Sequence, residues 1–201
     1  MTMHQPQGET TRRRLLRGAV LGSLPWALLP ASRAVARPSG VDYPTAQSAP
    51  ASTSNYTASS RPDSYAIDRV IIHVTQETWS DTLAIFQNPS KKVSAHYVVR
   101  SEDGQVAQCV RERHIGWHAG NWNHNTRSIG IEHEGWVDQP KYFTDALYTS
   151  SAALTAAICA KHDIPRDRRH IIAHSEVPGA DHTDPGPHWD WSRFMRLVER
   201  A

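Results

Sequence analysis

The stretch Arg69-Val-Ile-Ile-His-Val74 decides the fold of this chain. Consecutive apolar, β-branched residues favour a β-strand. The run does not alternate with polar residues, and this is typical of a strand that is buried on both faces. Such strands lie in the middle of sheets that are covered by helices. We therefore predict a central strand over residues 69–74, with His73 near its end.

The segments that follow predict a sheet with helices packed on it. Apolar residues at helical spacing predict helices that begin near Thr78, Thr144 and Trp191. Runs with strand character predict further strands at residues 95–100, 105–110, 129–134 and 171–173. Asp103-Gly104 indicates a hairpin turn between the first two of these strands. The predicted fold class is α/β, a single domain with a mixed central β-sheet flanked by helices.

The N-terminus has the pattern of an export signal. Residues 11–17, Thr-Arg-Arg-Arg-Leu-Leu-Arg, contain a twin-arginine pair, and a short apolar run and the cleavage-site pattern Ala34-Val-Ala36 follow. Pro25 and Pro30 interrupt the apolar run, which is also too short to cross a bilayer as a helix. We interpret residues 1–36 as a twin-arginine-type signal and expect no stable membrane insertion after its cleavage.

Residues 37–64 differ in composition from the rest of the chain. They are rich in Pro, Ser and Ala and contain few large aliphatic side chains. Such a segment buries too little apolar area to offset its conformational entropy, so we predict a flexible linker. The folded domain is then residues 65–201. The net charge of +2 is too small to indicate a nucleic-acid-binding surface, and we expect no nucleic-acid partner.

The sequence contains two cysteines, Cys109 and Cys159. An exported protein meets an oxidising environment, which permits a disulfide. Cys109 falls on a predicted strand and Cys159 on a predicted helix, so a bridge requires that helix to pack over that strand at the right separation. Two separate buried thiols are the alternative, and the sequence leaves both open.

Histidine is abundant, with twelve in the chain. Three potential metal ligands, His73, His174 and Asp184, fall at the ends of predicted elements. A catalytic zinc ion needs about three nitrogen or oxygen ligands and an open position for water, which these side chains could provide. Spacing alone does not select them from the other histidines. His133-Glu134 begins like the His-Glu-x-x-His helix of zinc proteases, but Val137 replaces the second histidine.

A series of motifs resembles the N-acetylmuramoyl-L-alanine amidase family, whose zinc amidase fold is shared with peptidoglycan recognition proteins and phage lysozyme-like amidases. In chain order, the motifs are Val93-Ser-Ala-His-Tyr97, Trp117-His-Ala-Gly120, Ser128-Ile-Gly-Ile-Glu-His-Glu-Gly135 and His182-Thr-Asp-Pro-Gly-Pro187. The resemblance implies a zinc-dependent hydrolase that cuts the amide bond between the lactyl group of N-acetylmuramic acid and L-alanine of the stem peptide. Peptidoglycan or muropeptides would be the substrate, Zn²⁺ the cofactor, and the secreted or wall-associated enzyme a monomer.

The resemblance also implies roles for individual residues. It assigns the zinc ligands to His73, His174 and Asp184, and assistance of the attacking water to Glu132. Glu134 is the rival of Glu132, because strand alternation places both on one face. His182 occupies a position where similar enzymes carry lysine, and a hydrogen-bond donor there could stabilise the oxyanion.

Substrate contacts are expected from Trp117, His118, Asn121 and His96, again from the resemblance. Aromatic faces and amide groups suit the recognition of sugars and peptides. Core packing is the alternative for Trp117.

A different class of function is a receptor that binds peptidoglycan without cutting it. The full set of metal ligands and the candidate base argue against a receptor. A zinc peptidase that cuts within the stem peptide is a third possibility.

Overall fold

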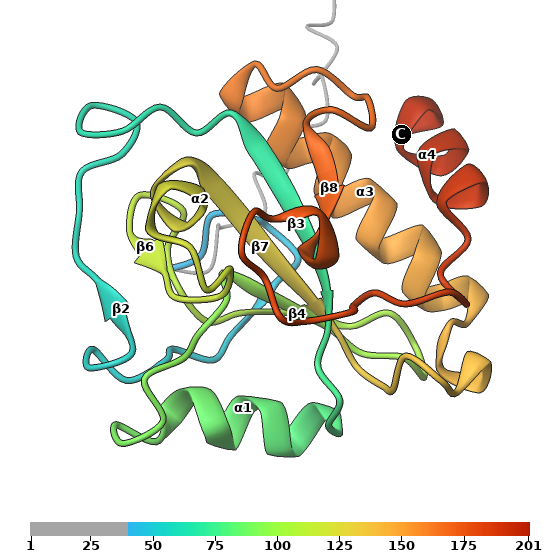
Figure 1. The fold of residues 1–201 in the computed structure, drawn as a ribbon, viewed down its shortest axis with the longest axis horizontal. Helices are drawn as coiled ribbons and strands as arrows, with labels where there is room; N and C mark the ends of the chain where they lie inside the picture. Colours follow the sequence, from blue (N-terminus) through green and yellow to red (C-terminus); the bar gives the residue numbers. More distant parts are fainter. Residues whose placement is uncertain (1–39) are drawn as a thin grey trace, which may run out of the picture. The chain divides into compact units, whose positions relative to one another are not determined.

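The computed structural model describes residues 40–201, so the export signal predicted over residues 1–36 lies outside the described residues. Its centre is a mixed six-stranded sheet with the order β1-β5-β4-β7-β3-β8 (Figure 1). The strands are β1 (Gln47–Ser48), β3 (Arg69–Val74), β4 (Tyr97–Val99), β5 (Val106–Gln108), β7 (Ser128–His133) and β8 (Ile171–Ala173). A separate antiparallel pair consists of β2 (Tyr56–Thr57) and β6 (Ile115–Gly116). The predicted fold class is confirmed.

Strand β3 is central, as the sequence predicts. It lies between β7 and β8 and is parallel to both, and all of its residues except Arg69 are buried. Strand β4 is parallel to β7 on the far side and antiparallel to β5, which confirms the predicted hairpin. Gly104 in the hairpin turn has a φ of 72°, a left-handed conformation that favours glycine.

Helices form where the sequence has capping residues ahead of an apolar pattern. They are α1 (Trp79–Gln87), α2 (Trp122–Arg127), α3 (Asp145–His162) and α4 (Trp191–Arg200), with short 3₁₀ turns at Pro140–Tyr142 (η1) and His174–Glu176 (η2). Thr78 and Thr144 cap α1 and α3 through their side-chain oxygens. Helix α2 was not predicted, because its segment is rich in Gly and Asn; the Asn121 side chain caps it by accepting a hydrogen bond from His124 N. Over residues 40–201, no helix is both long and apolar enough to cross a membrane.

The two faces of the sheet have different surroundings. Val70, Ile72, Ile129 and Ile131 belong to a core that also contains buried residues of α3 and α4, and Figure 1 shows these two helices together on one side. Because side chains alternate along a strand, His73 and Glu132 point to the opposite face. On that face α1 packs through Phe86 against Val98 and Ala107 of β4 and β5. The candidate site is therefore carried by the face that α3 and α4 do not cover.

The linker prediction is wrong for residues 40–64. Strand β1 pairs with β5, and Ala46, Ala49 and Ala51 are buried. Asn55 donates to the carbonyl oxygens of Phe86 and Asn88 at 2.7 and 2.9 Å, while the buried Arg61 guanidinium contacts five backbone carbonyl groups. Small side chains and directed hydrogen bonds, which composition does not reveal, hold this segment on the domain.

The two cysteines are free and buried. Cys109 belongs to the core beside α1, whereas Cys159 belongs to the core beneath α3. The two thiols therefore lie in different clusters, and of the two alternatives the structure has separate buried thiols.

Candidate active site

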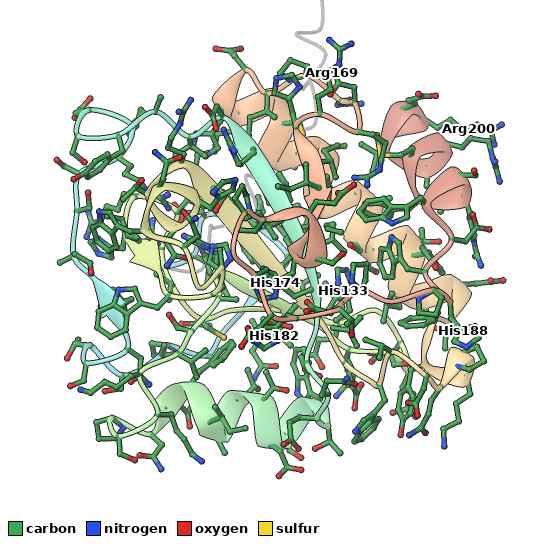
Figure 2. The ribbon with its side chains drawn as sticks, in the orientation of Figure 1. His133, Arg169, His174, His182, His188 and Arg200 are labelled. Carbon is green, nitrogen blue, oxygen red and sulfur yellow. The ribbon has the colours of Figure 1, made fainter. Side chains whose placement is uncertain are left out.

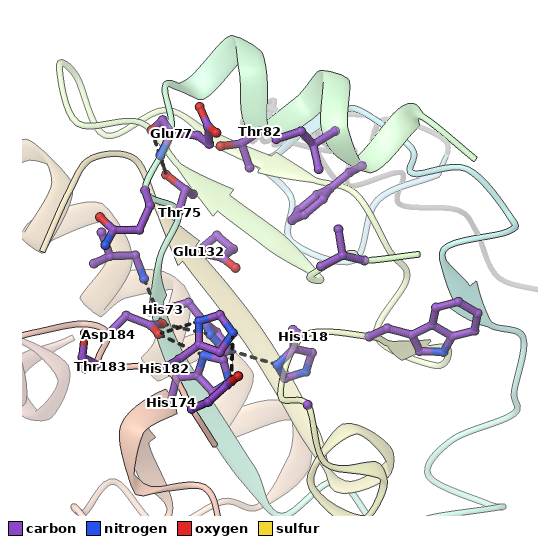
Figure 3. A pocket seen from close by; sticks show the side chains of 18 of the residues that line it. His73, Thr75, Glu77, Thr82, His118, Glu132, His174, His182, Thr183 and Asp184 are labelled. Atoms are coloured by element: carbon purple, nitrogen blue, oxygen red, sulfur yellow. Dashed lines mark hydrogen bonds and ion pairs between the residues drawn. The ribbon is translucent and has the colours of Figure 1, made fainter. Parts of the chain in front are cut away.

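Candidate catalytic residues meet because of strand register. In the parallel pair of β3 and β7, His73 lies directly opposite Glu132. Strand β8 flanks β3 on its other side, and His174 follows β8 immediately. The loop after η2 carries His182 and Asp184 to the same place, as Figure 3 shows. Residues more than 100 positions apart in the chain, such as His73 and Asp184, are thus brought into contact.

His73, His174 and Asp184 form a buried cluster whose potential ligand atoms all lie within 4.8 Å of one another. The Nδ1 atoms of His73 and His174 lie 3.2 and 3.0 Å from the two carboxylate oxygens of Asp184. His174 Nε2 is buried and has no hydrogen-bond partner among residues 40–201. Two imidazoles and one carboxylate that converge in this way fit a catalytic zinc ion, which binds three such ligands and keeps one position open.

The charges of the cluster also suit a cation. Burial lowers the pKa of His73, and although Asp184 opposes this shift, the imidazole stays neutral near pH 7. Burial would raise the pKa of Asp184, but its contacts with the rings of His174 and His73 outweigh that effect and hold the pKa well below its ordinary value. A neutral imidazole and an ionised carboxylate are the forms that bind metals.

Glu132 and Glu134 are separated by the structure. Glu132 lines the pocket, and its Oε2 is buried without a hydrogen-bond partner among the described residues. Burial, together with the charge of Asp184, raises its pKa well above the ordinary value. Strand β7 ends at His133, so the alternation stops before Glu134, whose carboxylate accepts hydrogen bonds from Trp79 N and Ser101 N at 3.0 and 2.8 Å. Glu134 thus ties the start of α1 to the β4–β5 hairpin.

His182 lies at the surface beside the cluster. Its side chain is 63% exposed, and its Nδ1 is 3.9 Å from Asp184 Oδ1. Its ring stacks on that of His174, with centroids 4.6 Å apart and planes 19° apart. Figure 2 shows His174 and His182 close together, whereas His188 lies at the edge of the domain. His182 is thus the exposed histidine that shares the cavity with the cluster.

The cluster opens into a pocket of about 610 Å³. Thr82, Ile85 and Phe86 of α1 line it, so part of its wall is apolar. Thr75, Gln76 and Glu77, which follow β3, and Lys92 also line it. Sequence reasoning missed these residues, because none belongs to a motif with a chemical signature; their place just after a buried strand was the available signal.

Of the residues expected to contact substrate, Trp117 and His118 line the pocket. The expectation is wrong for His96, which is fully buried, accepts a hydrogen bond from Gly130 N at 3.0 Å and has its pKa lowered to about 3 by burial and by Arg61. Asn121 does not line the pocket; it caps α2 and donates to Pro178 O at 3.0 Å, and its contact with substrate stays a prediction. The imidazole of His96 and the side-chain amide of Asn121 both form hydrogen bonds within the protein. His118 is only 6% exposed, and its ring nitrogens contact His73 and Ser128.

Comparisons with known proteins agree with this geometry. The family model described as N-acetylmuramoyl-L-alanine amidase matches residues 63–187. N-acetylmuramoyl-L-alanine amidase A of Achromobacter lyticus is 36% identical over 176 residues, which cover 79% of this chain and 96% of the relative. The 1,6-anhydro-N-acetylmuramyl-L-alanine amidase AmpD of Citrobacter freundii is 39% identical over 53% of this chain and 58% of its own length. A crystal structure of a selenomethionine AmpD derivative has a TM-score of 0.65 at 29% identity and covers 78% of this chain and 96% of that one.

The family match spans more than half of the chain and contains the whole cluster and Glu132. Its region also contains the motifs on which the resemblance rests. The chain therefore belongs to the N-acetylmuramoyl-L-alanine amidase family, and it is an enzyme of this type that acts on peptidoglycan.

Proposed function

We propose that the enzyme is zinc-dependent and hydrolyses the amide bond between the lactyl group of N-acetylmuramic acid and L-alanine of the stem peptide. The observation that carries this proposal is the buried cluster of His73, His174 and Asp184, with ligand atoms within 4.8 Å, at the floor of a pocket that also holds Glu132. A bound zinc ion would polarise the amide carbonyl and make water a better nucleophile at neutral pH.

Glu132 acts as the general base in this mechanism. Its carboxylate removes a proton from the attacking water and passes it to the nitrogen of L-alanine as the carbon–nitrogen bond breaks. A carboxylate with a raised pKa is the stronger base, and burial raises the pKa of Glu132. Because Glu132 is opposite His73 on the neighbouring strand, the sheet fixes its position relative to the metal ligands.

His182 and Trp117 act on the substrate. A ring nitrogen of His182 can donate a hydrogen bond to the amide oxygen as negative charge develops there. The indole of Trp117 lines the pocket and its Nε1 donates to Thr57 Oγ1 at 2.9 Å, so the ring is held in place for contact with a sugar or peptide. His182→Ala should lower kcat by about tenfold or more without loss of metal. Normal turnover would show that His182 is a bystander.

Defined muropeptides, incubated with and without a chelator and analysed by mass spectrometry, test reaction, bond and metal together. We expect free glycan and free stem peptide only when zinc is present. His73→Ala, His174→Ala and Asp184→Ala should each lose tight zinc binding and activity. Cleavage inside the stem peptide would indicate a peptidase, and binding without cleavage a receptor.

We also propose that residues 1–36 direct export by the twin-arginine route and that the mature enzyme is a secreted or wall-associated monomer. The support is the sequence pattern at Arg12 and Arg13. Replacing both arginines by lysine should leave unprocessed enzyme inside the cell. Secretion at the normal level would contradict this route, and a dimer in size-exclusion chromatography would contradict the oligomeric state.

A further inference from the structure

Behind His73, a chain of hydrogen-bonding groups leads away from the pocket. His73 Nε2 lies 3.0 Å from His118 Nδ1, and His118 Nε2 lies 3.3 Å from Ser128 Oγ. Ser128 Oγ lies 2.6 Å from the backbone carbonyl oxygen of His124. His73, His118 and Ser128 are all buried, with at most 6% of any residue exposed. Figure 3 shows the rings of His73 and His118 joined by this contact.

The backbone carbonyl of His124, at the end of this series of hydrogen bonds, fixes the direction of every hydrogen bond in the series. A carbonyl oxygen can only accept, so the single hydroxyl proton of Ser128 is donated to His124. Ser128 Oγ can then only accept from His118, and the Nε2 atom of His118 must carry a proton. The ring of His118 contacts an imidazole and a hydroxyl, not a carboxylate, and burial of an unpaired cation is costly. The ring is therefore neutral, and its Nδ1 is an acceptor.

The same reasoning determines which ring nitrogen of His73 carries the proton. Because His118 Nδ1 accepts, His73 Nε2 must donate and carries the ring proton. The lone pair of a neutral His73 is then on Nδ1, which is the atom that faces Asp184 Oδ2 at 3.2 Å. The protein interior thus selects which nitrogen of His73 is free to bind a metal ion.

The backbone around His118 keeps its ring in place. A Cβ atom added at Gly130 would lie 2.6 Å from the ring, so the glycine on β7 provides the space for it. Asn125 Oδ1 accepts hydrogen bonds from His118 N and Ala119 N at 3.1 and 2.8 Å. Several groups therefore cooperate to hold the ring against His73.

We propose that His118 is a positioning residue which, with Ser128, holds His73 so that its Nδ1 is presented to the metal ion between His174 and Asp184. This inference rests on the proposed zinc dependence. It replaces the expected contact of His118 with substrate, since both of its ring nitrogens are used within the protein. Groups that orient metal ligands in this way commonly change metal affinity by about 10–100-fold when they are removed.

Zinc affinity of the purified enzyme, measured by competition with a chromogenic chelator, tests the proposal. His118→Phe fills the space but cannot accept a hydrogen bond, and should weaken zinc binding about 10–100-fold. His118→Asn can place an amide oxygen near the position of Nδ1 and should restore most of the affinity. Ser128→Ala should give an intermediate loss. Leu154→Ala, a fully buried site on α3, is the control for lost stability and should leave zinc affinity unchanged.

A spectroscopic readout makes the test independent of activity. In long-range ¹H–¹⁵N spectra of the zinc-loaded enzyme, His73 Nε2 should be protonated and His73 Nδ1 should show the shift of a metal-bound nitrogen. Zinc bound through His73 Nε2, or equal zinc affinity of wild type and His118→Phe, would overturn the inference and leave zinc dependence intact. Failure of the wild type to bind zinc would instead overturn the proposed function and this inference with it.

Discussion

Glu132 and Glu134 stand two positions apart, and the structure predicts opposite effects when each is changed to glutamine. Glu132→Gln keeps the shape of the side chain but cannot take a proton from water. General-base assistance contributes about 10²–10⁴-fold, so kcat should fall by about that factor, or about 3–5 kcal/mol of transition-state stabilisation at 1.36 kcal/mol per decade. Metal content should not change, because Glu132 does not belong to the ligand cluster.

The effects of the two substitutions on stability should be the reverse of their effects on activity. Burial raises the pKa of Glu132, so in the metal-free protein its ionised form opposes folding. This cost is absent below the unfolded-state pKa of about 4.3, increases as the pH rises above it, and is constant above the folded-state pKa. Metal-free Glu132→Gln should therefore be more stable than wild type at neutral pH, and the gain should vanish in acid. Glu134→Gln places an amide NH₂ against one of two backbone N–H donors and should cost about 1–3 kcal/mol.

Steady-state kinetics on a defined muropeptide and urea unfolding in the presence of a chelator measure both effects on the same proteins. The combination is the test, since an inactive but stable Glu132→Gln excludes misfolding as the cause of the lost activity. Glu134→Gln should retain most of its turnover despite its lower stability. If Glu134→Gln is the less active variant, the assignment of the base is wrong. If metal-free Glu132→Gln is less stable than wild type at pH 7, the argument that burial of the Glu132 charge opposes folding is wrong.

Three further predictions concern other parts of the domain. Burial would raise the pKa of Asp42, but hydrogen bonds, chiefly from Arg111, hold it below its ordinary value. Asp42→Asn should therefore lower the free energy of unfolding by about 1.5–3 kcal/mol at pH 7. In urea titrations this difference should shrink below about pH 4, and a difference that does not change with pH would contradict the prediction. Burial raises the pKa values of Cys109 and Cys159 to about 12 and about 11. A thiol reagent at neutral pH should therefore label neither cysteine in the native enzyme and both cysteines in guanidinium. Rapid labelling of the native enzyme would show that the thiols are accessible. Trp117→Ala should raise KM for a muropeptide about 2–10-fold with a smaller effect on kcat, and an unchanged KM would assign the indole to packing.

The sequence predicted the regular elements that carry a strong local signal. Residues 69–74 are apolar throughout and form the central strand, and Thr144 begins a helix that continues to His162. Elements without such a signal were missed. The segment 40–64 has no aliphatic pattern because alanines and the hydrogen bonds of Asn55 and Arg61 hold it on the domain. Long-range hydrogen bonds of this kind depend on the tertiary fold, so composition cannot reveal them.

The candidate site was predictable to the extent that motifs fix residues and the fold fixes register. The resemblance selected His73, His174 and Asp184, and the structure brings these three together. It could not exclude His96, because burial of a motif residue depends on what packs over it. The resemblance chose Glu132 over Glu134. Strand alternation alone could not separate the two, because their separation depends on where β7 ends, and element ends are the least certain part of any prediction from a single sequence.

Strand β7 shows why structure and chemistry are joined so closely in this domain. Ile129 and Ile131 face the core beneath α3 and α4, and this apolar packing fixes the register of β7 against β3. The alternate residues are Gly130, which makes room for the ring of His118, and Glu132, which lies opposite His73. A slip of one residue would expose the isoleucines and also remove Glu132 from the pocket. The hydrophobic pattern that stabilises the sheet is therefore the same feature that aligns the base with the metal ligands.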